Sequence, residues 1–241
     1  MTSEIPRINT TGIEAILFDK DGTLLDFDAT WTPAYEEAAR FASKGILSEA
    51  ERFLEKTGLD LETRNSAAGS LLAAGNSEEI AEAWIAGGAD FSLDDLTSEL
   101  DRIFVSKMHD AKPLTGIRET VDWLLDRGFR LGVASSDSEA AIRAFLEGSG
   151  LAPKFEFVTG YDTGHGPKPE PGMVLGFASA IGLPPAKIAV VGDNMHDIDM
   201  AKAAGAGLTI GVLTGTSAQE DLETHADIIL PSASDLPRCL S

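Results

Sequence analysis

The sequence has a single cysteine, few basic residues and no long hydrophobic run. Because Cys239 is alone, no intrachain disulfide can form, which is typical of proteins in a reducing cytoplasm. No stretch approaches the roughly 20 apolar residues that a membrane-spanning helix needs. The opening residues, MTSEIPRINTTG, lack the apolar segment of a signal peptide. We therefore expect a cytoplasmic protein with no membrane partner.

Basic residues are outnumbered two to one by acidic ones. The 241 residues include 19 lysines and arginines against 39 aspartates and glutamates, so the formal net charge is -20. Such a balance argues against nucleic-acid binding, which needs clustered lysine and arginine, and against docking on anionic lipid. If the substrate is an anion, a local group must attract it, because the overall field repels it.

What the sequence does contain is an alternation of short apolar runs and helical patterns. Its length suffices for a sizeable core, 43% of its residues are apolar, and no internal repeat is visible. The near-continuous runs are typical of strands buried on both faces of a parallel sheet. The predicted strands cover residues 13–19, 129–135, 155–160, 187–193 and 207–213, with a possible edge strand at 226–230. Helical patterns at 117–128, 139–150 and 172–183 lie between them, and Gly128 is placed to end the first. We predict an α/β fold with a doubly wound, mostly parallel, Rossmann-like sheet.

One long segment interrupts the alternation with helical patterns and no convincing strand. Residues 48–51 have the spacing of a capping box, and residues 92–104 carry apolar side chains at helical spacing. We predict hinges at residues 26–30 and 109–116. The predicted units are an α/β core of residues 1–27 and 112–241 and an inserted all-helical cap of residues 28–111.

The stretch AILFDKDGTLLD places Asp19 and Asp21 at the end of the first predicted strand, followed by Gly22. Two carboxylates this close repel each other, which raises the pKa of one or recruits a divalent cation. The alternative is an acidic turn, because aspartate and glycine are ordinary turn formers. Strand alternation predicts that Lys20 points away from the active site.

Chemically capable residues also follow three other predicted strands, where open α/β sheets bind ligands. Ser135 and Ser136 precede a helix, where hydroxyls and amides bind anions, although an N-cap also explains them. Lys168 lies between two prolines and presents an ammonium from a stiff loop, unless it is an ordinary solvated lysine. Asp193 and Asp197 lie one helical turn apart, a pattern that a helix start also explains.

Together these motifs resemble the haloacid dehalogenase-like hydrolase superfamily, whose members are mostly phosphatases. Its first motif, Asp-x-Asp-Gly-Thr, is matched by residues 19–23, and its fourth, Gly-Asp-x-x-x-Asp, by residues 192–197. The serine that ends a strand is matched by Ser135, and the lysine by Lys168. The helical insertion resembles that of the helical-cap subclass, typified by phosphoglycolate phosphatase and β-phosphoglucomutase.

The resemblance implies catalysis by two aspartates. Asp19 would attack the substrate phosphorus and form an aspartyl-phosphate. Asp21 would protonate the leaving alcohol and then take a proton from the hydrolytic water. Ser135, Ser136 and Lys168 would bind the phosphoryl oxygens as charge develops.

The resemblance also implies Mg²⁺ as cofactor. Asp19, the backbone carbonyl of Asp21, and Asp193 would hold the ion, while Asp197 would bind a metal water or steady Lys168. The dehalogenases and phosphonatases of the superfamily carry a different residue at the position of Asp21. An alcohol leaving group needs a proton donor there and a halide does not, so Asp21 favours phosphate esters.

The predicted function is therefore a Mg²⁺-dependent phosphatase for a small phosphorylated metabolite. Phosphoglycolate is the best guess by resemblance, with sugar phosphates, nucleotides and pyrophosphate as open alternatives. A phosphomutase of the β-phosphoglucomutase type is the runner-up. A non-catalytic phosphate- or metal-binding module is disfavoured because Asp19 and Asp21 are both present. His165 is interpreted as a loop residue and His196 as an exposed helix residue.

Substrate identity depends on the predicted cap. The helical spacing of Trp31 and Tyr35 indicates packing, whereas Arg64 and Asn65, in a probable loop, are better candidates for substrate contact. The full set of cap candidates is Trp31, Tyr35, Arg40, Lys44, Arg64 and Asn65. We expect the cap to close over small substrates on the microsecond-to-millisecond timescale of lids.

Overall fold

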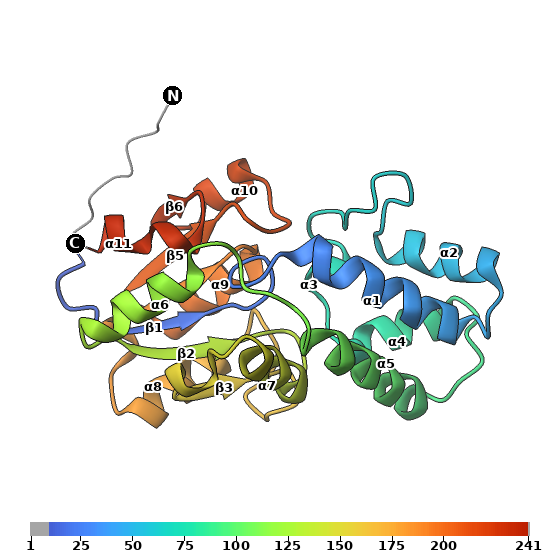
Figure 1. The fold of residues 1–241 in the computed structure, drawn as a ribbon, viewed down its shortest axis with the longest axis horizontal. Coiled ribbons are helices and arrows are strands. Elements are labelled where there is room, and N and C mark those ends of the chain that lie inside the picture. Colours follow the sequence, from blue (N-terminus) through green and yellow to red (C-terminus); the bar gives the residue numbers. More distant parts are fainter. Residues whose placement is uncertain (1–9, 241) are drawn as a thin grey trace.

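One all-parallel sheet forms the centre of the computed structural model, which describes residues 10–240 (Figure 1). Its strand order is β3-β2-β1-β4-β5-β6. The strands are β1 (Ala15–Phe18), β2 (Arg130–Ala134), β3 (Phe157–Thr159), β4 (Ile188–Gly192), β5 (Leu208–Val212) and β6 (Ile228–Leu230). All six predicted strands are present, shorter by one or two residues at most ends, and β6 lies at an edge as expected. The predicted fold class is confirmed.

The sheet is covered by helices on both faces because side chains alternate along its strands. In β1, Ile16 and Phe18 belong to one apolar cluster, while Ala15 and Leu17 belong to another on the opposite face. The first face packs against α6 (Ile117–Asp126), α7 (Glu139–Gly148) and α11 (Leu236–Cys239). The second face packs against α8 (Gly172–Ile181) and α9 (Met195–Ala204). Each buried Leu, Ile or Phe contributes roughly 1.5–3 kcal/mol, which is why these runs contain almost no polar residue.

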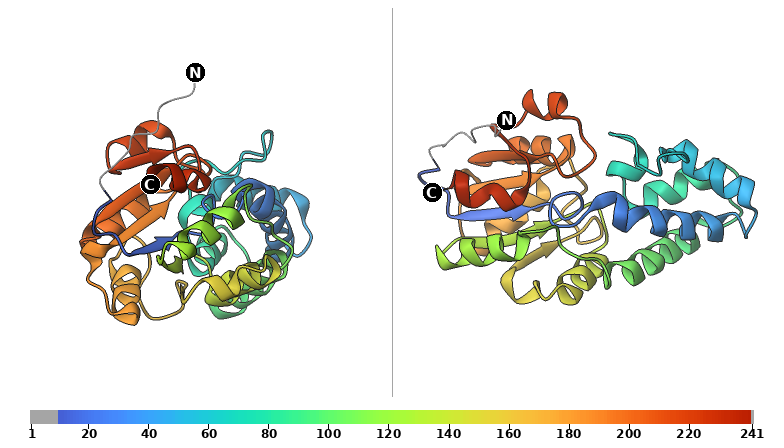
Figure 2. Two further views of the ribbon diagram at one scale, coloured as in Figure 1. Left: turned by 60° about the vertical axis from the view of Figure 1, so that its left-hand side comes forward. Right: turned by 45° about the horizontal axis from the view of Figure 1, so that its top comes forward.

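Five helices between β1 and β2 form the predicted helical insertion, and no strand occurs among them. They are α1 (Phe27–Ala42), α2 (Leu47–Thr57), α3 (Leu71–Ala74), α4 (Ser77–Ala86) and α5 (Leu93–Met108). Figures 1 and 2 show them grouped beyond the carboxyl ends of the strands. Their apolar side chains join one continuous cluster with the first face of the sheet. The division into separate units at residues 28 and 111 stays a prediction.

The two connections to the insertion lie side by side. Leu114 N donates to Leu24 O at 2.8 Å, and Leu25 forms an isolated bridge with Pro113. The second predicted hinge, residues 109–116, contains no helix or strand. The first, residues 26–30, is the start of α1, because the Asp26 carboxylate accepts from Ala29 N and caps the helix; both hinges stay predictions.

Helix ends follow local chemistry. α6 ends at Asp126, and Gly128 adopts the left-handed conformation (φ 82°) just beyond its cap. The capping box predicted at residues 48–51 is wrong, because the N-cap of α2 is Ile46, two residues before Ser48, and it provides no side-chain cap. A capping box does form at α4, between Asn76 and Glu79. The remaining short helices are η1 (Ala152–Lys154), η2 (Pro185–Lys187), α10 (Gln219–Glu223) and η3 (Ala233–Asp235).

The sequence predicts no membrane-spanning helix and no signal peptide. Within residues 10–240, none of the helices combines the length and apolarity that a bilayer crossing requires. The opening segment that was expected to lack signal-peptide character falls largely on residues 1–9, which lie outside the described residues.

Candidate active site

The carboxyl edge of the sheet brings three predicted site residues together. β1 pairs in register with β2 and with β4, so the three strands end at nearly the same level. Asp19, Ser135 and Asp193 each follow directly after one of them. Asp19 N donates to Val191 O at 2.8 Å, which extends the β1–β4 pairing by one residue. Sheet register alone therefore places these three side chains as neighbours.

Lys168 connects two of the site's carboxylates. It lies between β3 and α8, and its Nζ contacts Asp19 Oδ1 and Asp197 Oδ1, both at 2.6 Å. All three side chains are buried, so the charge-assisted hydrogen bonds are shielded from water. The lysine is therefore a fixed part of the site rather than a solvated loop residue.

Three carboxylates gather around a common point. Asp19, Asp193 and Asp197 each offer one oxygen, and these oxygens all lie within 4.8 Å of one another. Asp193 Oδ2 also accepts a hydrogen bond from Thr216 N at 2.9 Å. Asp197 Oδ2 accepts one from Asn194 N at 3.2 Å. Asp19 Oδ2 is buried without a hydrogen-bond partner among the described residues. Since oxygens on opposite sides of a Mg²⁺ ion lie about 4 Å apart, small side-chain movements suffice for a shared ion.

The electrostatics of this cluster favour a cation. Burial raises the pKa of Asp19 to about 7; Lys168 opposes the shift, and the Asp197 and Asp21 carboxylates add to it. Burial, followed by the charges of Asp19 and Asp197, raises the pKa of Asp193 well above its ordinary value. One ammonium does not offset three buried carboxylates, and a divalent cation with oxygen ligands fits the deficit.

A pH-dependent stability follows for the metal-free protein. A carboxyl whose pKa is raised by folding stabilises the native state fully only below its unfolded pKa. For Asp19 that contribution is lost as pH rises from the ordinary carboxyl pKa of 3.8 through the raised pKa of about 7. We expect the free energy of unfolding in EDTA to fall by a few kcal/mol over this range. Urea titrations with and without millimolar Mg²⁺ measure it, and saturating Mg²⁺ should remove most of the fall by binding the native state. An unchanged slope with Mg²⁺ would contradict this prediction.

Glycines let the backbone approach the carboxylates closely. A Cβ added to Gly215 would lie 1.8 Å from Asp193 Oδ2, and one added to Gly192 would lie 2.3 Å from Asp197 Oδ2. Gly22, at φ +72°, would bring a Cβ within 2.8 Å of Asp193. Glycine is therefore required at these positions for the cluster to form.

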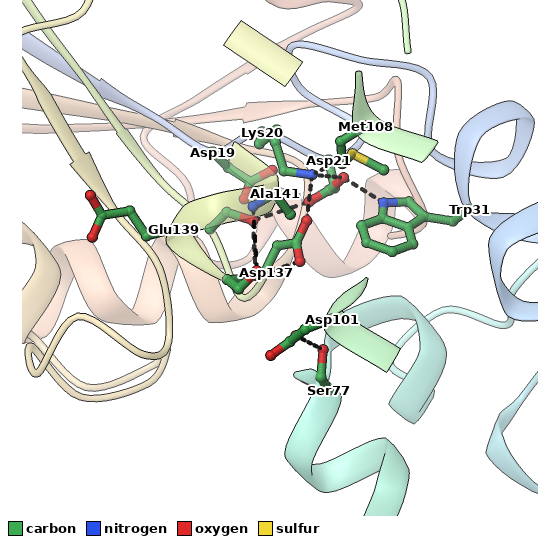
Figure 3. Close-up of polar contacts among 12 residues, drawn as sticks. Asp19, Lys20, Asp21, Trp31, Ser77, Asp101, Met108, Asp137, Glu139 and Ala141 are labelled. Carbon is green, nitrogen blue, oxygen red and sulfur yellow. Dashed lines mark hydrogen bonds and ion pairs between the residues drawn. The ribbon is translucent and has the colours of Figure 1, made fainter. Parts of the chain in front are cut away.

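Asp21 lies apart from the three-carboxylate group and has partners of its own (Figure 3). Its Oδ1 accepts from Lys20 Nζ at 2.7 Å and from the indole Nε1 of Trp31 at 2.5 Å. Its Oδ2 accepts from Ser135 Oγ at 3.1 Å. Trp31 belongs to α1, so the helical insertion supplies one of these partners directly.

The interpretation of Lys20 was wrong. Its side chain does not line the cavity at the site, but it is fully buried and its ammonium contacts Asp21. Asp137 Oδ2 lies 3.1 Å from the same Nζ, and Met108 Sδ lies 3.3 Å from it. The centroid of the Trp31 ring lies 5.0 Å from this Nζ. Burial opposes the charge of Lys20, but Asp21 and Asp137 raise its pKa overall. Strand alternation fails here because Lys20 lies beyond β1, in the turn.

The two predicted serines occupy different places. Ser136 lines the cavity, whereas Ser135 is completely buried behind it and also accepts from Asp137 N at 3.1 Å. His165 is a loop residue, as predicted, and packs on Phe157. His196 is not exposed as predicted: it is half-buried on α9 and lines the cavity.

The cap residues that line the cavity are not the ones that the sequence favoured for substrate contact. Trp31 and Tyr35 do pack, stacked at 5.3 Å between ring centroids, but both also line the cavity. Arg64 turns outward to Glu36, with its guanidinium 2.9 Å from that carboxylate. Asn65 is not among the lining residues, and neither are Arg40 and Lys44. Asn194, which the sequence interpretation overlooked, lines the cavity with its Nδ2 buried and unpartnered among the described residues.

Comparison with known proteins assigns the family. Residues 13–205 match the model of the haloacid dehalogenase-like hydrolases, so the chain belongs to that family. The pyrophosphatase PpaX of Bacillus pumilus is 29% identical over 95% of this chain and 97% of its own. Phosphoglycolate phosphatase 1 of Pseudomonas aeruginosa is 28% identical over 99% of this chain and 84% of its own. The crystal structure of a predicted phosphoglycolate phosphatase from Haemophilus somnus has the same fold, with a TM-score of 0.72, 18% identity, and coverage of 97% of this chain and 100% of that one.

Proposed function

We propose that this hydrolase is a Mg²⁺-dependent phosphatase that acts on a small phosphorylated metabolite through an aspartyl-phosphate. The observation that supports it most is the position of Asp19. Its Oδ1 is held by Lys168, its Oδ2 is buried without a hydrogen-bond partner among the described residues, and Asp193 and Asp197 lie close to the same carboxylate. A carboxylate held this way is oriented for in-line attack on phosphorus.

Each proton and bond in the proposed reaction has a residue assigned to it. Asp19 forms a bond to phosphorus as the bond from phosphorus to the ester oxygen breaks, and Asp21 gives that oxygen its proton. Water then attacks the phosphorus and gives a proton back to Asp21 as the bond between phosphorus and the Asp19 oxygen breaks, so inorganic phosphate leaves and the Asp19 carboxylate is regenerated. Lys168 and the Ser135–Ser136 segment stabilise the phosphoryl oxygens, with Ser136 closer to the cavity.

The metal would be held by residues already close together. Asp19, Asp193 and the Asp21 backbone carbonyl are the proposed ligands of Mg²⁺. Asp197, whose Oδ1 accepts from Lys168, would steady that lysine or bind a water of the metal ion. When bound, the ion neutralises the carboxylates and polarises the phosphoryl group. The buried and unpartnered Asp19 Oδ2 supports this assignment.

The proposal includes a cytoplasmic location and a substrate that is a small metabolite rather than a nucleic acid. Phosphoglycolate and pyrophosphate both remain candidate substrates, because two relatives of this chain are named as phosphatases for them. A phosphomutase remains the alternative enzyme, because an insertion that covers the site also suits a reaction that excludes water.

Release of phosphate from p-nitrophenyl phosphate tests the proposal. We expect turnover that EDTA abolishes and added Mg²⁺ restores. A non-catalytic binding module would give no turnover under any condition. A mutase would release little net phosphate from sugar phosphates and would need a bisphosphate primer.

A further inference from the structure

The cavity at the site has two chemically different sides. The space inside it that water-sized molecules can reach is about 50 Å³, and it opens to solvent at its mouth. The metal-binding carboxylates and Lys168 lie on the sheet side. The opposite side is formed by the helical insertion, and its largest side chains are apolar or aromatic. They are Phe27, Trp31, Tyr35, Leu72, Ile80 and Phe104.

The insertion brings no cation to this cavity. Among the described residues that line it, Lys168 is the only lysine or arginine, and it is occupied by Asp19 and Asp197. The imidazole of His196 is the one other basic group. Basic side chains of the insertion instead form ion pairs on its outer surface. Examples are Lys44 with Asp90, Arg64 with Glu36 and Lys107 with Glu37.

Negative charge is in excess where the leaving group would lie. Asp21 and Asp137 line the cavity beyond the three-carboxylate group, and both are served by one ammonium, that of Lys20. A second anionic group on the substrate would face these carboxylates without a counterion. Like charges brought together in this way repel each other, which weakens binding of such a substrate.

Few side-chain hydrogen-bond donors remain on the insertion side. Tyr35 donates to Leu72 O at 2.6 Å, and Ser77 donates to Asp101 at 2.6 Å, which Figure 3 shows below the indole of Trp31. Asn76 keeps its side-chain NH₂ without a partner among residues 10–240, because its oxygen caps α4. These few free side-chain donors suit an apolar group of the substrate with at most one or two neutral hydrogen-bond acceptors.

We infer that the preferred substrate is the phosphate monoester of an uncharged, largely apolar alcohol, and that esters carrying a second anionic group are poor substrates. This inference rests on the proposed phosphatase function and narrows it. Packing hydrocarbon of the substrate against the apolar wall would strengthen binding, because it removes apolar surface from water. Phosphoglycolate, pyrophosphate and sugar bisphosphates would lack a partner for their second anion.

Two matched ester pairs test the inference. Phosphoglycolate and its carboxamide have nearly the same size, and only the former carries the extra charge. Benzyl phosphate and ethyl phosphate are both esters of primary alcohols. Only benzyl phosphate has a hydrocarbon group large enough to pack against the apolar wall. We expect kcat/KM to favour the carboxamide and benzyl phosphate by about tenfold or more each. A higher kcat/KM for phosphoglycolate than for its carboxamide would overturn the inference.

A charge added to the wall provides the converse test. Ala74 lines the cavity at the end of α3, so Ala74→Lys places an ammonium there, and Ala74→Gln is its uncharged control. We expect Ala74→Lys, and not Ala74→Gln, to shift the ratio of kcat/KM toward phosphoglycolate by about fivefold. An unchanged ratio in Ala74→Lys would count against the inference. Absence of Mg²⁺-dependent turnover with every ester would overturn the proposed function as well, whereas a preference for phosphoglycolate overturns the inference alone.

Discussion

Asp19→Asn should lower kcat/KM for every phosphate ester by about four orders of magnitude. The amide keeps the shape of the carboxylate but is a poor nucleophile, and it provides a weaker metal ligand. The protein should still fold, because Lys168 retains Asp197 as partner and one of three mutually repelling carboxylates is removed. Initial rates of phosphate release, with melting temperatures in EDTA, measure both effects.

The matched control is Asp126→Asn, which changes an exposed aspartate at the end of α6. It removes the same charge far from the site and should keep wild-type kcat/KM. If Asp19→Asn retained more than about one per cent of the activity, covalent catalysis by Asp19 would be refuted.

Asp21→Asn should have an effect that depends on the leaving group. We expect kcat/KM for benzyl phosphate to fall by about 10²–10⁴-fold, because an alkoxide cannot leave without a proton. With p-nitrophenyl phosphate the loss should be at least tenfold smaller, since nitrophenolate is stable as an anion. The ratio of kcat/KM for the two esters reports only the steps up to aspartyl-phosphate formation, so slow hydrolysis of the intermediate does not obscure it.

Equal losses for both esters would show that Asp21 acts through structure or metal binding rather than as a proton donor. This outcome is distinguishable from misfolding, because a misfolded variant would also lose Mg²⁺-induced thermal stabilisation. Asp126→Asn serves again as the control for loss of one negative charge.

Residues at strand ends were the part of the site that sequence could predict. Asp19, Ser135 and Asp193 each follow an apolar run, and the parallel pairing of those runs fixes where the next residue lies. Lys168 was also predictable as an ammonium in a stiff loop, and the structure places it between two carboxylates. The strand positions along the chain, the helical insertion and the fold class follow from the same apolar patterns.

Residues on the insertion could not be assigned, because helical spacing shows that one face is buried without showing what it faces. Trp31 and Tyr35 serve both packing and the cavity wall, a dual role that a period of 3.6 residues cannot reveal. Arg64 suggested substrate contact by its charge, but a neighbouring helix supplies Glu36 as its partner. Lys20 was misjudged because its partner Asp137 lies more than a hundred residues away in sequence.

The buried ammonium of Lys20 has a mechanical consequence. It contacts Met108, the last residue of the insertion's final helix, and lies beneath the ring of Trp31 near the start of its first. Both ends of the insertion therefore contact the Lys20 side chain, which also donates a hydrogen bond to Asp21. If the insertion swings outward, the indole leaves Asp21 and the acid loses a donor at the same moment. We therefore expect Asp21 to have its full set of hydrogen-bond donors only while the insertion stays in contact with it.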